Sequence, residues 1–266
     1  MTETAHAAAV PPDGPTLFAR FAFPPNQLGY CGPDDHGALL EYAATGEVDG
    51  GLRQLAQGFE GAWPYLELIA GSNRIDDPLD RRVVDAYWIG NDLLEHVPLL
   101  DVGLSVTDRF RGRAGRLWEQ LAAAVTPEAR LCHAFHVFAV YPWVGLLRSG
   151  SVEQPLHVLD RCRIRWGQVV EATGDRVLVR TRPLTWEATT MTIGLGEPTI
   201  EEVTASRDGL GLVHDLEVGE WVALHWDWVC DRLSPSRLAR LRHYHDVALG
   251  GVNTTEAAAR LPWEEH

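Results

Sequence analysis

Two stretches in the second half of the chain decide its fold. Residues 161–170 read Arg-Cys-Arg-Ile-Arg-Trp-Gly-Gln-Val-Val, and residues 219–229 read Gly-Glu-Trp-Val-Ala-Leu-His-Trp-Asp-Trp-Val. Polar and apolar residues alternate in both, which predicts strands with one buried face. The strands place one thiol, Cys162, and one imidazole, His225, at strand ends of a small β module. A soft sulfur and a nitrogen ligand on a rigid scaffold suit a transition metal better than hydrolytic chemistry.

The same alternation predicts further strands between and around these stretches. Thr173-Gly174-Asp175 joins the first two as a hairpin, because glycine readily adopts the positive φ of tight turns. Ser234-Pro235 predicts the start of a last helix that runs to about Leu249. The pattern is therefore a compact β-barrel followed by a helix. Its predicted strands lie at 162–172, 176–182, 187–195, 200–205 and 220–229.

The first half of the chain has helical periodicity instead. Apolar residues recur three and four positions apart from about residue 17 to residue 150. Thr126-Pro127-Glu128 has the capping residue, first-turn proline and acid of a helix start. We predict a helical bundle with helices at 37–44, 51–70, 80–89, 109–124 and 128–147.

The length of 266 residues predicts about two domains. The expected fold class is α+β, with an N-terminal all-α helical domain followed by a small β-barrel and a C-terminal helix. The predicted boundaries are a disordered leader at 1–15, the helical domain at 16–150, the barrel domain with its helix at 151–252, and a tail at 253–266.

The charge of the chain restricts its partners. All 23 basic residues are arginines, and 37 acidic residues leave a net charge of -14, which disfavours nucleic acid and anionic membranes. Arg161, Arg163 and Arg165 form a basic stripe that could meet an acidic partner. The N-terminus has no signal-peptide pattern, and the longest apolar stretch, 134–147, is too short to span a bilayer. A soluble, cytoplasmic protein is expected.

The second half also resembles a known family. Residues 162–179 are similar to the opening hairpin of the HypC/HupF family of hydrogenase-maturation chaperones. Val218-Gly219-Glu220-Trp221-Val222-Ala223-Leu224-His225 resembles their closing strand, and the whole chain resembles an uncharacterised bacterial family. The resemblance implies an OB-like barrel in which Cys162 and His225 stand where that family has its cysteine and histidine. In the family the cysteine follows the initiator methionine, whereas Cys162 is internal.

The resemblance implies a role as an accessory or chaperone in nickel-iron hydrogenase maturation. Cys162 and His225 would hold iron, as a unit with cyanide and carbon monoxide ligands. The partners would be the hydrogenase large subunit or another maturation protein. If the pair is functional, His225 lowers the pKa of the Cys162 thiol or joins the coordination, and Asp227 could hold the second imidazole nitrogen. Equally, Cys162 could be a buried apolar residue and His225 a hydrogen-bonded barrel residue.

Secondary candidates lie near turns and in the helical half. Cys230 follows the second stretch and offers another thiol, although a packing role explains it as well. Cys31 lies in a loop rich in glycine and proline before a predicted helix start, where its pKa would be lowered. Cys132, His133 and His136 are three and four residues apart, so two of them can face one point on a helix.

An alternative function follows from that helical segment. It is an iron- or haem-dependent enzyme whose site lies in the helical domain around His133 and His136, with the barrel as a docking module. Carboxylates that could complete such a site are Glu60, Glu67, Asp85 and Glu95, with His96. A scaffold without metal is a third possibility. The sequence has no Walker loop, GxGxxG motif, GxSxG elbow or HExxH motif, which disfavours nucleotide-driven and serine-hydrolase chemistry.

Overall fold

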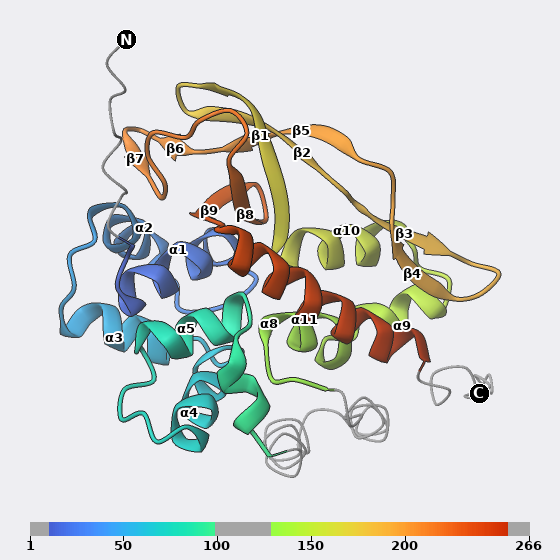
Figure 1. Ribbon diagram of the computed structural model, residues 1–266, viewed down its shortest axis with the longest axis horizontal. Coiled ribbons are helices and arrows are strands. Elements are labelled where there is room, and N and C mark those ends of the chain that lie inside the picture. Colours follow the sequence, from blue (N-terminus) through green and yellow to red (C-terminus); the bar gives the residue numbers. More distant parts are fainter. Residues whose placement is uncertain (1–10, 99–128, 255–266) are drawn as a thin grey trace.

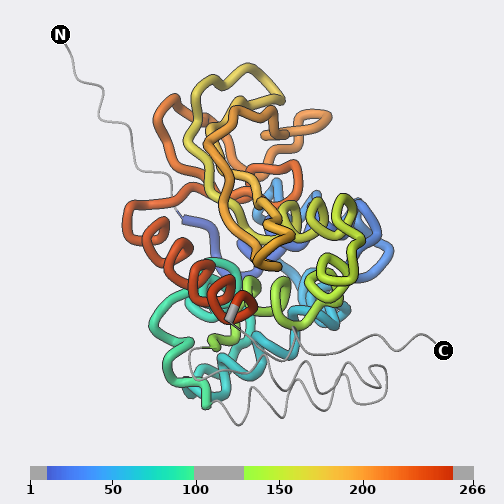
Figure 2. The backbone as a smooth tube through the Cα atoms, turned by 90° about the vertical axis from the view of Figure 1, so that its right-hand side faces the viewer, coloured from blue at the N-terminus to red at the C-terminus, as the bar shows by residue number. Residues whose placement is uncertain are grey.

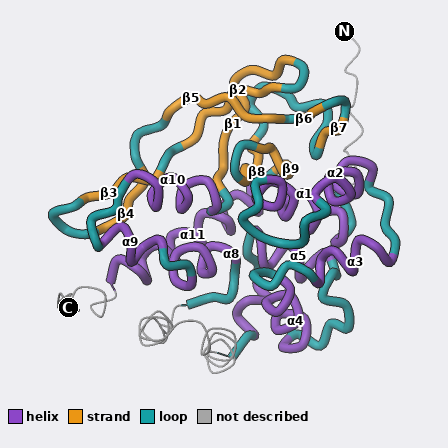
Figure 3. Tube along the Cα trace, turned by 180° about the vertical axis from the view of Figure 1, so that it is seen from behind, coloured by secondary structure: helices purple, strands orange, loops and turns teal. Residues whose placement is uncertain are grey.

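The structure is a computed structural model that describes residues 11–98 and 129–254. It combines helices and sheets, as the sequence predicts, with most strands on one side and most helices on the other (Figure 1, Figure 2, Figure 3). Within the described ranges, no helix has the length and apolar character that crossing a membrane requires. The predicted helix at 109–124 and most of the predicted leader and tail lie outside the described residues.

The first described range is helical. Its elements are α1 (Gly14–Gln27), α2 (His36–Thr45), α3 (Gly50–Gln57), α4 (Trp63–Ser72), α5 (Arg81–Trp88) and the 3-10 helix η1 (Asp92–His96). The carboxylate of Asp13 caps α1 by accepting the N–H of Thr16 at 2.8 Å. The predicted helix at 51–70 is two helices, because the segment with Gly58 and Gly61, poor helix formers, interrupts it.

Residues 133–162 form short helices, so the predicted continuous helix at 128–147 is wrong. They are α8 (His133–Phe135), the π-helix η2 (His136–Val140), α9 (Trp143–Arg148) and α10 (Glu153–Cys162). The N–H of Tyr141 donates to the carbonyl of His136 at 3.1 Å, and Pro142 has no N–H to continue the ladder. The chain therefore leaves helical geometry at Tyr141, one π-helical turn after His136. Single π-helical turns occur frequently at functional sites.

Five strands form a closed ring in the order β1-β2-β5-β9-β8. They are β1 (Arg165–Thr173), β2 (Arg176–Thr181), β5 (Thr199–Thr204), β8 (Trp221–His225) and β9 (Trp228–Arg232). Neighbours are antiparallel except β5 and β9, which are parallel. Gly174 has a φ of 59°, which confirms the predicted hairpin turn. Two small hairpins complete the strands: β3 (Leu184–Glu187) with β4 (Thr192–Leu195), and β6 (Ser206–Arg207) with β7 (Leu210–Gly211).

Three strand predictions need correction. Cys162 is the last residue of helix α10 and not a strand residue, because Pro155, Val158, Leu159 and Cys162 are buried at helical spacing. The predicted strand at 220–229 is the hairpin of β8 and β9, since Trp226 has a φ of 51° and turns the chain. The predicted strand at 187–195 spans parts of the hairpin β3–β4.

The predicted basic stripe is not available to an acidic partner. Arg163 and Arg165 are buried, and each pairs with an internal carboxylate: Arg163 with Asp160 at 2.9 Å and Arg165 with Glu201. Arg161 also pairs with Glu201, at 3.1 Å. These ion pairs anchor the end of α10 and the start of β1.

One hydrophobic core crosses the predicted domain boundary at residue 150. It contains residues of α1, such as Leu17 and Phe21, together with ring residues such as Val222. Phe23 of α1 packs edge-on against Trp228 of β9, with ring centroids 5.1 Å apart. Helix α11 (Pro235–Thr254) begins at the predicted residue and crosses the middle of the molecule between the strands and the helices (Figure 1). The division into domains itself stays a prediction.

Arg237 of α11 holds the ring and the helices together. Its Nη1 donates to Asp231 of β9 at 2.7 Å and its Nε to Asp85 of α5 at 2.9 Å, and all three side chains are largely buried. We predict that Arg237→Met lowers the free energy of unfolding by about 3 kcal/mol, because two buried carboxylates lose their partner. Urea unfolding measures this change.

Arg240→Met is the matched control on the same helix. Arg240 pairs at 3.6 Å with the exposed Asp92, and its loss is expected to cost less than about 1 kcal/mol. Equal effects of the two substitutions would contradict the role of Arg237.

Candidate metal centre

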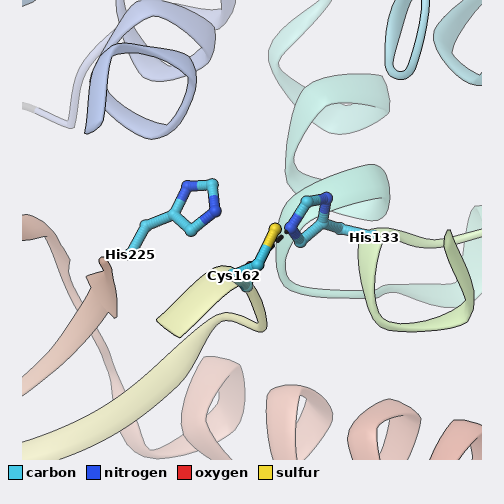
Figure 4. A group of neighbouring side chains, drawn as sticks. All are labelled: His133, Cys162 and His225. Atoms are coloured by element: carbon cyan, nitrogen blue, oxygen red, sulfur yellow. Dashed lines mark hydrogen bonds between the residues drawn. The ribbon is translucent and has the colours of Figure 1, made fainter. Parts of the chain in front are cut away.

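Three side chains from distant parts of the chain converge on one point. His133 begins α8, Cys162 ends α10 and His225 ends β8. One potential ligand atom of each lies within 4.8 Å of the others, and all three residues are buried. In Figure 4 the Cys162 sulfur lies between the two imidazoles. The structure thus brings together the predicted pair, Cys162 and His225, and adds His133 from the helical half.

A proline inside α1 creates the acceptor that orients His225. In a regular helix the carbonyl of Phe21 would accept the N–H of residue 25, but that residue is Pro25 and has no N–H. The Phe21 carbonyl instead accepts the Nδ1–H of His225 at 2.6 Å. Because a carbonyl only accepts, the proton of the neutral imidazole is on Nδ1 and the lone pair is on Nε2. Within the described part of the chain, this buried Nε2 makes no hydrogen bond.

His133 has two competing hydrogen-bond arrangements. Its Nε2 lies 2.8 Å from the Cys162 carbonyl oxygen, which requires a proton on Nε2. Its Nδ1 lies 3.3 Å from the Tyr87 hydroxyl, which also lies 3.1 Å from the Gly61 carbonyl. When Tyr87 donates to Gly61, Nδ1–H of His133 can donate to Tyr87, and Nε2 becomes a lone pair facing the cluster. An outer partner of this kind is what a metal-bound histidine needs.

The turn after His225 is tied to the chain around Cys162. Trp226 donates its backbone N–H to the carbonyl of Arg161 at 2.8 Å, and its own carbonyl accepts from the Arg165 guanidinium. These bonds flank Cys162 on both sides in the sequence. They hold the end of α10 against the β8–β9 turn. These hydrogen bonds to the backbone therefore keep the Cys162 thiol close to the His225 imidazole.

Burial keeps the three groups uncharged. It lowers the pKa of His133 to about 4 and the pKa of His225 well below its usual value, with the proximity of His133 adding to the latter. Burial also raises the pKa of the Cys162 thiol, and the nearby Cys31 raises it further. Neutral imidazoles are the form that binds metals, and a cation would supply the charge that deprotonates the thiol.

The cluster borders a cavity of about 220 Å³. All three clustered residues line it, and so do two other predicted candidates, Cys31 and His136. His136 Nδ1 lies 3.0 Å from the Tyr65 hydroxyl. Burial raises the pKa of Cys31 to about 12, so the predicted lowering of this pKa is wrong.

The remaining candidates lie outside the cluster. Cys132 is buried beside a second, much smaller cavity, and Cys230 is buried with its sulfur 3.7 Å from the Trp228 carbonyl. Asp227 does not hold His225, since its side chain is 61% exposed and pairs with Arg161 at 3.1 Å. That correction follows from the Phe21 carbonyl, which occupies Nδ1 of His225.

The predicted carboxylate site of the helical half is not assembled among the described residues. Asp85 pairs with Arg237, and Glu95 pairs with Arg130 at 2.8 Å. His96 Nδ1 lies 2.7 Å from the side-chain oxygen of Asn73. In the part of the chain that the structure describes, the one group of three or more histidine, cysteine or acidic ligands within metal-binding distance is His133, Cys162 and His225.

The sequence over residues 10–259 matches DUF6390, a family of unknown function. The chain belongs to this family. No curated protein and no solved structure matches it.

This match overturns the resemblance to the HypC/HupF chaperones. The family found spans both halves of the chain, and no match to HypC/HupF accompanies it. The structure shows a physical reason: the resemblance took residues 162–179 as one strand hairpin, whereas Cys162 belongs to helix α10. The hydrogenase-maturation role rested on that resemblance and loses its basis.

Sequence reasoning missed the outer contacts of the cluster. Phe21 contributes only its backbone, and Tyr87 lies in a helix whose aromatic residues suggest a core. The sequence does contain a signal for the Phe21 contact, namely Pro24-Pro25 inside an apolar segment. Prolines within a helix leave carbonyls of the preceding turn without a donor.

Pro25→Ala tests the origin of the His225 orientation. The alanine restores an N–H that competes for the Phe21 carbonyl, so we expect metal affinity to fall about tenfold, as for other outer-shell changes. The folded state should be at least as stable as wild type, because a proline inside a helix is unfavourable. Metal titration and thermal unfolding measure the two effects.

Pro24→Ala is the matched control. It frees the neighbouring N–H, which meets the carbonyl of Arg20 and not that of Phe21, so metal affinity is expected to stay at the wild-type level. An equal loss in both variants would mean that helix geometry, and not the freed carbonyl, orients His225.

The low pKa of His133 predicts how stability depends on pH without metal. Between pH 6.5 and pH 4 the unfolded chain binds a proton that the folded chain does not. Neutral His133 contributes on the order of 3 kcal/mol to the free energy of unfolding. This contribution is complete above pH 6.5 and is lost as the pH falls toward 4. Urea titrations across this range should show a shallower dependence for His133→Gln. A pH dependence in His133→Gln as steep as in wild type would contradict this assignment.

Proposed function

We propose that the chain is a metal-dependent enzyme whose single metal ion is bound by His133, Cys162 and His225. The observation that carries the proposal is the buried Nε2 lone pair of His225, which makes no hydrogen bond in the described part of the chain and lies beside a thiol and a second imidazole. Three protein ligands and one open position are typical of catalytic rather than structural zinc sites. The open position would face the cavity that all three residues line.

The residues fit such an ion in chemistry and in distance. Imidazole and thiolate suit zinc(II) and iron(II), and ligand bonds of about 2.0–2.3 Å in a tetrahedron separate the ligand atoms by about 3.5 Å. The cluster, at up to 4.8 Å, closes by about 1 Å to reach this geometry. Binding would release the thiol proton and move the proton of His133 to Nδ1, where Tyr87 accepts it.

A metal at this site would supply Lewis acidity toward a molecule in the cavity. The chain itself would hold the ligands in place through the Phe21 carbonyl and Tyr87, and the aromatic walls would limit access of water. Iron, the expected metal, fits this site as an ion. A haem does not, since the cavity of about 220 Å³ is below the range of about 300 Å³ and more that drug-sized ligands occupy.

We also infer that the strand ring is an OB-like barrel. In chain order its strands are the first, second, third, fifth and fourth around the ring, and the third and fifth are parallel. Five strands closed in one sheet support this assignment. The ring would then act as the scaffold that presents His225, and not as a separate docking module.

Metal analysis of the purified chain tests the enzyme's proposed centre. We expect one zinc or iron ion per chain in wild type, and a loss of more than about 10- to 100-fold in affinity in His133→Ala, Cys162→Ser and His225→Ala. With cobalt(II) in place of the native ion, a thiolate charge-transfer absorption should appear in wild type and be absent in Cys162→Ser.

Cys230→Ala is the control, because it removes a buried thiol outside the cluster. It should retain the metal and the charge-transfer absorption. A wild-type chain that binds no zinc, iron or cobalt at micromolar concentration would refute the proposal, and so would equal metal retention in all three ligand variants.

A further inference from the structure

The cavity beside the cluster has walls made mostly of rings. Two of its lining residues are exposed, Tyr30 at 45% and Pro142, so we infer that the cavity opens to the surface beside them. No described residue that lines it is an aspartate, glutamate or arginine. The aromatic side chains in its lining are Tyr30, Phe59, Tyr87, Trp88, Tyr141 and Trp143.

We propose that this cavity binds one uncharged molecule with a single aromatic ring, of the size of phenol, as the substrate class of the enzyme. An apolar cavity of about 150 Å³ accommodates benzene. The cavity here, at about 220 Å³, has room for the ring and a small polar substituent. The orientation of that substituent toward the metal rests on the proposed metal centre, whereas binding of the ring does not.

The chemistry of the walls favours a neutral ring over an anion. Aromatic side chains attract another ring through edge-to-face and offset-stacked contacts. A buried carboxylate would lack a cationic partner, because no arginine is among the described residues that line the cavity and the chain has no lysine. Without metal the cavity should therefore discriminate strongly against benzoate, which has a ring of the same size.

Hydrogen bonds fix the loop that carries Tyr30 at the exposed side of the cavity. Asn26, at the end of α1, donates through its side chain to the carbonyls of Cys31 and Pro33 at 2.8 and 2.7 Å. These bonds fix the loop that carries Tyr30, whose ring lies 4.3 Å from the Trp226 ring. The chain that leaves the π-helix η2 at Tyr141 also lines the cavity.

Gly61 provides a way to fill the cavity without touching the three clustered residues. A Cβ at this position would lie 3.2 Å from His136 Nε2 and 3.9 Å from the Tyr141 hydroxyl, and both of these residues line the cavity. The backbone of Gly61 is not among the positive-φ positions, so alanine causes no backbone strain there, and its tight contact with His136 directs the added carbon into the cavity. Gly71→Ala is the matched control, since a Cβ there meets no atom within 4 Å.

Phenol binding to the full chain, measured by calorimetry before and after metal removal, tests the proposal. We expect saturable binding of one phenol per chain in both states, and binding of benzoate to the metal-free chain at least about tenfold weaker. Gly61→Ala should weaken phenol binding about tenfold, as one added carbon does in an apolar pocket, and Gly71→Ala should not. Val158→Ala, which removes two carbons from the wall, should strengthen binding of the larger 2-naphthol.

The outcomes separate this proposal from that of the metal centre. A chain that binds metal but no phenol refutes the substrate class alone, and a chain that binds phenol but no metal refutes the metal centre alone. In the metal-free chain, benzoate binding as tight as phenol binding would overturn the proposal. Phenol affinity unchanged in Gly61→Ala together with 2-naphthol affinity unchanged in Val158→Ala would also overturn it. Thermal unfolding of each variant verifies that it is folded.

Discussion

The hydrogen bond from His225 to the Phe21 carbonyl is the interaction on which the site depends. It exists because Pro25 has no N–H to donate to that carbonyl. The Phe21 carbonyl oxygen therefore remains free to accept a hydrogen bond from a residue 204 positions away. The bond fixes the tautomer of His225, and with it the direction of the remaining lone pair. It also ties the first helix to the strand ring. The missing N–H of Pro25 therefore determines both how α1 contacts the strand ring and which nitrogen of His225 is available to a metal.

Burial then determines what the cluster can bind. The chain is strongly acidic overall, yet none of the described residues around the cavity is an aspartate or glutamate. A divalent ion with one thiolate would leave a net positive charge in an apolar environment. This charge favours a fourth ligand that is anionic or becomes so on binding, because a buried charge is costly unless it is paired. The same environment keeps Cys162 protonated without metal, so ion binding and loss of the thiol proton are coupled.

Much of the architecture could be predicted from the sequence, because it follows from local rules. The start of the last helix at Ser234-Pro235 depends on capping and φ preferences, and the hairpin at Gly174 depends on the positive φ of that glycine. The ends of the strands are harder to predict from the sequence, because they depend on tertiary contacts. Trp226 adopts a φ of 51°, unusual for a residue with a side chain, because tertiary bonds from Arg161 and Arg165 hold it there. Alternation alone predicts one long strand at that point.

The candidate site was predictable only in part, for the same physical reason. The sequence pairs Cys162 with His225, but its alternation predicts a strand at Cys162, whereas the burial there follows a helix. Sequence spacing relates His133 only to residues of its own helical segment, Cys132 and His136. No local rule places it beside Cys162, 29 residues away; the fold does so, through the bond from His133 to the Cys162 carbonyl.

The origin of the three ligands has a consequence for folding. His133 comes from the helical half, whereas Cys162 and His225 lie in the second half, so the three ligands come together only when both halves dock. An ion that binds only the docked state stabilises that state by mass action, in proportion to the logarithm of its concentration over its dissociation constant. The continuous core and the Arg237 bridge hold the two halves together in the folded state. Metal affinity would thus report on the docking of the two halves as well as on the ligands themselves.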